Sequence, residues 1–184
     1  MEFKKIQLNG FKSFAEKTTF IIDDGLTGIV GPNGCGKSNI VESLRWCMGE
    51  TSAKSMRGSG MEDVIFSGTS NKPSKNIAEV IINITNESKD GPIQYKNLEN
   101  IEIKRKIEKD KGSKFYINEK EVRAKDAQMF FADLSTGAHS PSIISQGRIG
   151  ALVTAKPTDR RAVLEEAAGI AGLHVRRHEA ELRL

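Results

Sequence analysis

The stretch Gly31-Pro32-Asn33-Gly34-Cys35-Gly36-Lys37-Ser38 decides the fold of this chain. It matches the pattern G-x-x-x-x-G-K-S/T, in which glycines allow successive backbone N–H groups to point at phosphate oxygens. An apolar run at residues 26–30 predicts a short strand before it, and apolar residues at helical spacing over 40–48 predict a helix after it. Strand, glycine loop and helix in this order predict a nucleotide site.

Lys37 and Ser38 carry the chemistry of this loop. The Lys37 ammonium can reach the β and γ phosphates of a nucleotide, and the Ser38 hydroxyl is placed to bind Mg²⁺. A helix that begins near Lys37 also directs its unpaired N–H groups and its positive dipole end at the phosphates. We therefore expect ATP and Mg²⁺ as cofactors.

Composition is that of an ordinary globular domain. The chain has 184 residues, of which 38% are hydrophobic and 28% charged, enough for one domain with a real core. Its net charge of +4 favours an anionic partner without specifying nucleic acid. The start alternates charged and apolar residues, so no membrane segment is expected. Cys35 and Cys47 have no metal-ligand spacing and predict reduced thiols in the cytoplasm.

The remainder predicts a β-rich region between helical pieces. A two-strand unit is expected at 3–8 and 18–22, and a loop with one brief element at 50–76. Further strands are expected at 77–85, 101–107, 114–118 and 121–123, with a hairpin turn at 110–112, and a short strand at 143–147. Helices are expected at 125–134, at 159–168 with Thr158 as N-cap, and at 173–184.

The acidic groups that hydrolysis requires are missing from the expected places. A carboxylate normally completes the Mg²⁺ shell. The nearest candidate, Asp133, ends the segment 129–133, but Leu134 follows it and the segment fits a core helix better. Leu134-Ser135-Thr136-Gly137 is similar to the Leu-Ser-Gly-Gly signature of ABC-type ATPases. It departs at Thr136 and precedes Gln146, the reverse of the order in that fold, so we interpret it as a loop.

Five blocks of sequence organise these observations. They are Gly10-Phe11-Lys12-Ser13-Phe14, the loop from Gly31 with Asn39, Ser55-Met56-Arg57-Gly58, Glu62-Asp63-Val64-Ile65-Phe66 and Ile144-Ser145-Gln146-Gly147-Arg148-Ile149. In this order they resemble the N-terminal head segment of bacterial SMC (structural maintenance of chromosomes) chromosome-partition proteins. The resemblance implies an α/β P-loop NTPase fold of ABC-ATPase type, as an N-terminal half-head with a mixed sheet, an antiparallel β lobe and the start of a coiled coil. Residues 1–168 would form the lobe and 169–184 the root of the coiled coil.

The resemblance also implies a function that this segment cannot perform alone. In that family a C-terminal half supplies the signature, the Asp-Glu pair and a switch histidine, and ATP lies between two heads. The expected partners are the C-terminal half of the same head, a second SMC head in a homodimer, a kleisin subunit and DNA bound without sequence preference. The parent would be an ATPase of chromosome condensation, organisation and segregation in the nucleoid-associated cytoplasm, and this segment alone would be inactive.

Individual roles follow from the same resemblance. Gln146 matches the glutamine-loop residue that reaches Mg²⁺ and the attacking water, and Arg57 matches an arginine near the γ-phosphate. Lys37, Gln146 and Arg57 are thus the expected catalytic residues, and Ser38 and Gln146 the Mg²⁺ ligands. The expected nucleotide-binding residues are Lys12, Ser13, Gly31, Pro32, Asn33, Gly34, Cys35, Gly36, Lys37, Ser38 and Asn39, with Lys12 and Ser13 near the base and ribose.

Basic residues are concentrated in the β-rich region. They are Lys104, Arg105, Lys106, Lys109, Lys111, Lys114, Lys120, Arg123 and Lys125, interleaved with Phe115 and Tyr116. Such a run fits either a solvated strand face or a track for DNA phosphates. Two other functions stay open at this point, namely the head of a related DNA-repair ATPase and a nucleotide-dependent scaffold that does not hydrolyse ATP.

Overall fold

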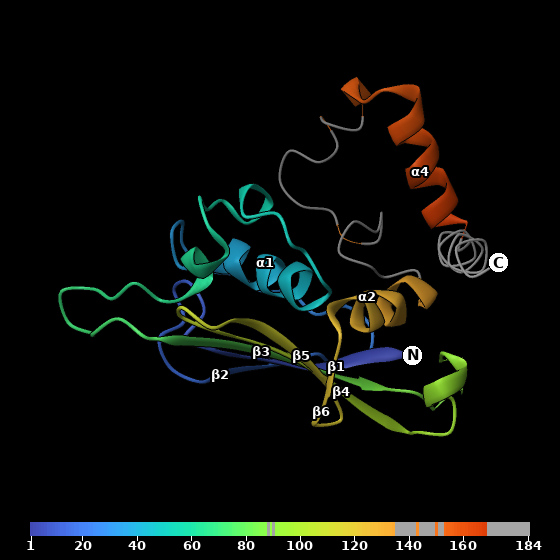
Figure 1. Cartoon of the computed structure of the whole chain (residues 1–184), viewed down its shortest axis with the longest axis horizontal. Coiled ribbons are helices and arrows are strands. Elements are labelled where there is room, and N and C mark those ends of the chain that lie inside the picture. Colours follow the sequence, from blue (N-terminus) through green and yellow to red (C-terminus); the bar gives the residue numbers. More distant parts are fainter. Residues whose placement is uncertain (88, 90, 135–142, 144–149, 151–152, 169–184) are drawn as a thin grey trace.

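A computed structural model describes residues 1–87, 89, 91–134, 143, 150 and 153–168. Its centre is one six-stranded sheet in the order β2-β1-β3-β4-β5-β6, antiparallel at every pairing (Figure 1). The strands are β1 (Glu2–Asn9), β2 (Thr18–Ile21), β3 (Ile77–Thr85), β4 (Asn100–Glu108), β5 (Gly112–Ile117) and β6 (Lys120–Val122). The described α-helices are α1 (Lys37–Cys47), α2 (Ala124–Asp133) and α4 (Pro157–Ala167).

The core lies between one face of this sheet and the helices α1 and α2 (Figure 1). Burial alternates strictly along β3 and β4, as expected for strands covered on one face. Ile82 lies opposite Ile103 across the two strands, and both are fully buried. Trp46 of α1 and Phe131 of α2 are fully buried in the same cluster. Burial of each such side chain stabilises the fold by about 1.5–3 kcal/mol.

Most of the predicted elements are confirmed. The two-strand unit at the start, the four strands of the β-rich region, the hairpin turn and the helices around 40–48 and 125–134 are all present. The loop at 50–76 holds two short 3₁₀ helices, Lys54–Met56 and Met61–Val64, where one brief element was expected. The β-rich region continues the sheet of the N-terminal strands, because β1 pairs directly with β3.

The predicted cap of the last described helix is wrong. Helix α4 begins at Pro157, so Thr158 lies inside its first turn. The Lys156 carbonyl accepts hydrogen bonds from the N–H groups of Asp159 (3.0 Å) and Arg160 (3.1 Å), which places the N-cap at Lys156. Proline favours the first helical position because its φ angle is already helical and it has no N–H that would need a partner.

The predicted strand at residues 26–30 is also wrong for this chain. These residues form no strand and pair with none of the described strands. Leu26 is 100% exposed and Val30 is 94% exposed. An apolar strand of this kind needs neighbours on both edges and cover on both faces. The half-head fold is therefore present, while the parallel part of the expected mixed sheet does not occur among the described residues.

Several expectations fall outside the described residues. They concern Gln146 and the rest of the strand at 144–147, the signature-like residues 135–137, the helix at 173–184, and hence the domain boundary after residue 168. In the part of the chain that is described, no helix is both long and apolar enough to cross a membrane.

Candidate nucleotide-binding site

The glycine loop and the first turn of α1 form an open helix N-terminus. Gly36 is the N-cap residue of α1, in a left-handed conformation with φ of 94°, and no side chain caps the helix. A Cβ atom at Gly36 would lie 2.5 Å from the Ser13 Oγ atom, and Gly34 also has a positive φ of 83°. Only glycine fits these positions without strain. The unpaired N–H groups of the helix start are thus presented at a surface where a phosphate can approach.

Lys37 is folded back over this loop. Its Nζ atom donates hydrogen bonds to the carbonyls of Gly31 (2.5 Å) and Pro32 (2.6 Å) and lies 3.7 Å from the Cys35 Sγ atom. Its contacts are therefore local and exposed, and phosphate oxygens can take the place of these carbonyls without disturbing the core. Of the other predicted positions, Asn33 lies in the loop, and Ser38 and Asn39 lie in the first turn of α1.

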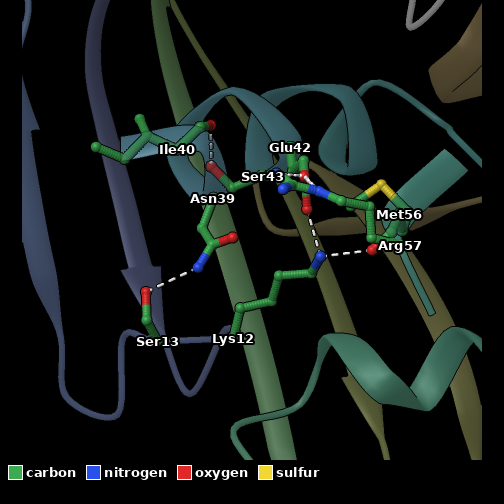
Figure 2. Close-up of polar contacts among 8 residues, drawn as sticks. All are labelled: Lys12, Ser13, Asn39, Ile40, Glu42, Ser43, Met56 and Arg57. Atoms are coloured by element: carbon green, nitrogen blue, oxygen red, sulfur yellow. Dashed lines mark hydrogen bonds and ion pairs between the residues drawn. The ribbon is translucent and has the colours of Figure 1, made fainter. Parts of the chain in front are cut away.

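The loop after β1 lies against the helix start (Figure 2). Asn39 donates from Nδ2 to the Ser13 Oγ atom at 2.9 Å. Lys12 has a positive φ of 47°, and its N–H donates to the Val64 carbonyl at 2.7 Å. Phe11 anchors the loop, since it is fully buried with its ring 5.4 Å from that of Trp46. The structure therefore brings Lys12 and Ser13 to the glycine loop, although they are distant in sequence.

Glu42 is a residue of this site that sequence reasoning missed. It is buried, with 6% of its surface exposed. One carboxylate oxygen accepts from Lys12 Nζ and the other from the Arg57 guanidinium (Figure 2). Lys12 Nζ also donates to the Met56 carbonyl at 2.5 Å. Glu42 follows Ser38 by four residues and so lies on the same face of α1, which was the one available sequence signal.

Arg57 reaches the site from the loop at residues 50–76. It follows the 3₁₀ helix Lys54–Met56 in a left-handed conformation with φ of 54°, and its side chain is 58% exposed. The neighbouring turn is fixed by Asp63, whose Oδ2 accepts from the N–H groups of Ser59 (2.6 Å) and Gly60 (2.9 Å). The Gly60 N–H, together with the Ser59 hydroxyl, holds the pKa of Asp63 below its ordinary value.

Arg105 does not belong to the basic surface track, which corrects the expectation from sequence. It is 3% exposed, on the core face of β4. Its guanidinium lies 4.5 Å from the ring centres of both Trp46 and Phe115 and donates to the carbonyls of Trp46 (2.6 Å) and Glu50 (2.7 Å) at the end of α1. Burial lowers the pKa of Arg105 to about 10, so the side chain stays charged at neutral pH.

The remaining basic residues of the track differ in their surroundings. Lys104 and Lys106 lie on the opposite, half-buried face of β4, and Lys104 Nζ is 5.1 Å from the ring centre of Tyr116. Phe115 is buried in the core. Lys114 forms an ion pair with Glu121 at 3.1 Å, as does Arg123 with Asp126. The open face of the sheet therefore carries cations that are partly neutralised.

The Mg²⁺ set remains incomplete in the described part of the chain. Asp133 ends helix α2, which confirms the helical interpretation of 129–133 over an acidic strand. Among the described residues, no group of three or more His, Cys, Asp or Glu side chains could hold a metal ion. Ser38 is the predicted Mg²⁺ ligand that the structure describes, and Gln146 lies outside the described residues.

Comparison with known proteins identifies the family of this chain. Residues 2–147 match the family described as the RecF/RecN/SMC N-terminal domain. The chain is 55% identical over its whole length to the chromosome partition protein Smc of Rhodopseudomonas palustris, of which it spans 16%. The chain thus covers only a small part of such relatives.

Solved structures show the same fold. A structure from work on ATP-driven dimerization and DNA-stimulated activation of SMC ATPases matches with a TM-score of 0.79 and 31% identity, over 91% of this chain and 99% of that one. The Smc head domain of Pyrococcus furiosus, bound to the C-terminal domain of ScpA, matches with a TM-score of 0.83 and 31% identity, over 98% of this chain and 45% of that one. The chain therefore belongs to the RecF/RecN/SMC N-terminal domain family, as the N-terminal segment of an SMC chromosome-partition head.

Proposed function

We propose that this chain is the ATP-binding half of an SMC ATPase head, which engages a second head when ATP is bound. The observation that carries the proposal is the open start of α1, where left-handed Gly36 leaves no room for a Cβ atom beside Ser13. A cradle that excludes side chains and exposes N–H groups fits a nucleotide polyphosphate.

The residues of the loop divide the binding task. The N–H groups from Gly34 to Ser38 donate hydrogen bonds to the phosphate oxygens, and Lys37 exchanges its carbonyl partners for the β and γ phosphates. The Ser38 hydroxyl, with Gln146, would hold Mg²⁺, which would screen the charge that develops on the transferred phosphate. Arg57 adds a forked guanidinium for phosphate oxygens. Lys12 and Ser13 border the loop on the side where base and ribose would lie.

In this proposal the chain supplies only part of the active site. Exposed apolar side chains on its surface support the need for a further part of the protein. Leu26, Ile29 and Val30 are apolar residues exposed by 100%, 48% and 94%. Such side chains are stabilised when a further part of the protein covers them. We assign that cover to the C-terminal half of the head, which would also supply the acidic residues and the signature. A second head then completes each site, and the segment alone is inactive.

The proposed partners and cellular process are based on the relatives. The Pyrococcus head is bound to ScpA, so a kleisin subunit is the proposed protein partner of this head. Residues 1–168 would form the lobe and 169–184 the root of a coiled coil. The proposed process is chromosome condensation, organisation and segregation in the cytoplasm, with DNA bound along the open face of the sheet by Lys104, Lys106 and their neighbours. Such contacts hold phosphates without reading sequence.

Reconstitution tests the proposal directly. The chain is mixed with the C-terminal half of the head, and ATP turnover is measured for each piece and for the mixture. Turnover only in the mixture supports the half-site, while turnover by the chain alone would overturn it. Lys37→Ala should abolish ATP binding in the mixture. An unchanged nucleotide affinity in that variant would remove the glycine loop from the site.

A further inference from the structure

We propose that Glu42 is a positioning residue, whose buried carboxylate holds Lys12 and Arg57 in place and presents Arg57 to the phosphates of the bound nucleotide. The inference rests on the proposed function, because it assumes that the glycine loop binds a nucleotide. It adds a residue of α1 that makes no direct contact with the ligand.

The geometry of the carboxylate supports this role. Each of its two oxygens serves a different cation, with Oε2 accepting from Lys12 and Oε1 from Arg57. The three side chains come from three separate segments, namely α1, the loop after β1 and the loop after the 3₁₀ helix Lys54–Met56. Figure 2 shows the cations converging on the carboxylate from these segments. Glu42 therefore fixes the two loops relative to the helix that carries the glycine loop at its start.

The three side chains of the cluster differ in exposure, and Arg57 is the one that faces solvent. The Glu42 side chain is 8% exposed and that of Lys12 is 14% exposed, whereas that of Arg57 is 58% exposed. Arg57 uses Nε and Nη2 for the Glu42 oxygen Oε1. A guanidinium has five N–H donors in a fixed plane, so donors remain on the solvent side for a second acceptor. A buried anchor and an exposed guanidinium together make a clamp for an anion.

The charges of Lys12, Arg57 and Glu42 also favour an anionic ligand. Lys12, Arg57 and Glu42 together carry one excess positive charge about one helical turn from Ser38, and the Asp63 carboxylate also lies near Lys12. The Glu42 carboxylate is engaged on both oxygens, so it is not a spare ligand for Mg²⁺. Lys12 and Arg57 both have left-handed backbones, with φ of 47° and 54°. Backbone strain of this kind persists where the surroundings hold it, and Glu42 is the group that these two residues share.

The test uses the full-length protein that contains this segment, with ATP affinity, KM and kcat measured for Glu42→Gln. The neutral amide removes the anchor but keeps its size, so Arg57 loses its orientation. We expect kcat to fall by about ten- to hundredfold, with KM for ATP and nucleotide affinity within about threefold of the unchanged protein. Glu42→Asp, which keeps the charge, should recover at least part of kcat. If Glu42→Gln does not fold, Glu42→Met takes its place with the same expectation, because it has a similar length and no polar group.

A double-mutant cycle separates positioning from a structural role. In an Arg57→Ala background, Glu42→Gln should lower kcat by less than about twofold, since no guanidinium is left to orient and Lys12, the remaining partner of Glu42, is expected near the base and ribose and not at the reacting phosphate. Glu50→Gln is the matched control, because Glu50 is also a buried carboxylate, paired with Arg45 near the other end of α1, and it should lower the melting temperature without the kcat effect. Equal losses from Glu42→Gln in both backgrounds, or a kcat no lower than that of Glu50→Gln, would overturn the inference. Loss of ATP binding in Lys37→Ala beside such a result would leave the proposed function intact.

Discussion

Replacing Arg105 by alanine should destabilise the fold by about 3–5 kcal/mol, because buried carbonyl groups lose their partner. The guanidinium donates to the carbonyls of Trp46 and Glu50 and to the Ser113 hydroxyl, and it lies between two aromatic rings. Each such charged hydrogen bond contributes about 1.5–3 kcal/mol and each buried cation–π contact about 2 kcal/mol. Desolvation of the cation opposes these gains by several kcal/mol, which is why the net loss is far below their sum.

Urea denaturation measures this loss, with the fluorescence of Trp46 as the signal because it is the only tryptophan. A loss of this size lowers the midpoint by about 1–2 M urea and the melting temperature by about 10 °C. Lys106→Ala is the matched control on the opposite face of β4 and should shift stability by less than about 0.5 kcal/mol. The urea midpoint of Arg105→Met should lie between those of Arg105→Ala and Lys106→Ala, because the apolar methionine side chain refills the space between the two rings. Equal midpoints for Arg105→Ala and Lys106→Ala would refute the reasoning.

Three further predictions concern the site and its surroundings. In native protein a thiol reagent should modify exposed Cys35 but not buried Cys47, whose pKa burial raises to about 12, and ATP should slow the modification; two fast thiols in native protein would contradict this. Gly36→Ala should weaken nucleotide binding and destabilise the fold by about 1–2 kcal/mol, because alanine disfavours the left-handed backbone, as a binding titration and a melting curve would show. The folded-state pKa of Asp63 is depressed, so its stabilising effect is present above the ordinary value of 3.8 and lost as pH falls below it. Asp63→Asn should therefore be less stable than the parent at pH 7, by a difference that shrinks as pH falls below 3.8, and a constant difference on acidification would count against the assignment.

The local sequence pattern was sufficient to predict the strands of the sheet and the helices of the core. The alternation of apolar residues over Ile77–Thr85 predicts a strand of that extent, and the structure has one. The glycines before Lys37 predict the left-handed start of α1, and Gly36 adopts it. In both cases the determinant lies within a few residues of the element.

Other features depend on partners far away in the sequence. The burial of Arg105 requires carbonyls 55 and 59 residues earlier, and the role of Glu42 requires Lys12, 30 residues before it. A charged residue in a strand or helix is usually solvated, so the composition of β4 favoured a surface track. The apolar run at 26–30 failed as a strand for the opposite reason, since local pattern indicates a strand but cannot supply its neighbours.

The uncovered side chains of Leu26 and Val30 have a consequence for how such a protein is made. In the relative from Rhodopseudomonas palustris the matched segment is 16% of the length. If the proposed C-terminal half of the head lies at the far end of such a chain, most of roughly a thousand further residues would be synthesised before it, which takes on the order of one to three minutes at about 5–20 residues per second. For that interval the nascent half-head would hold its uncovered apolar segment in water. We expect it to engage ribosome-associated chaperones until the other half emerges.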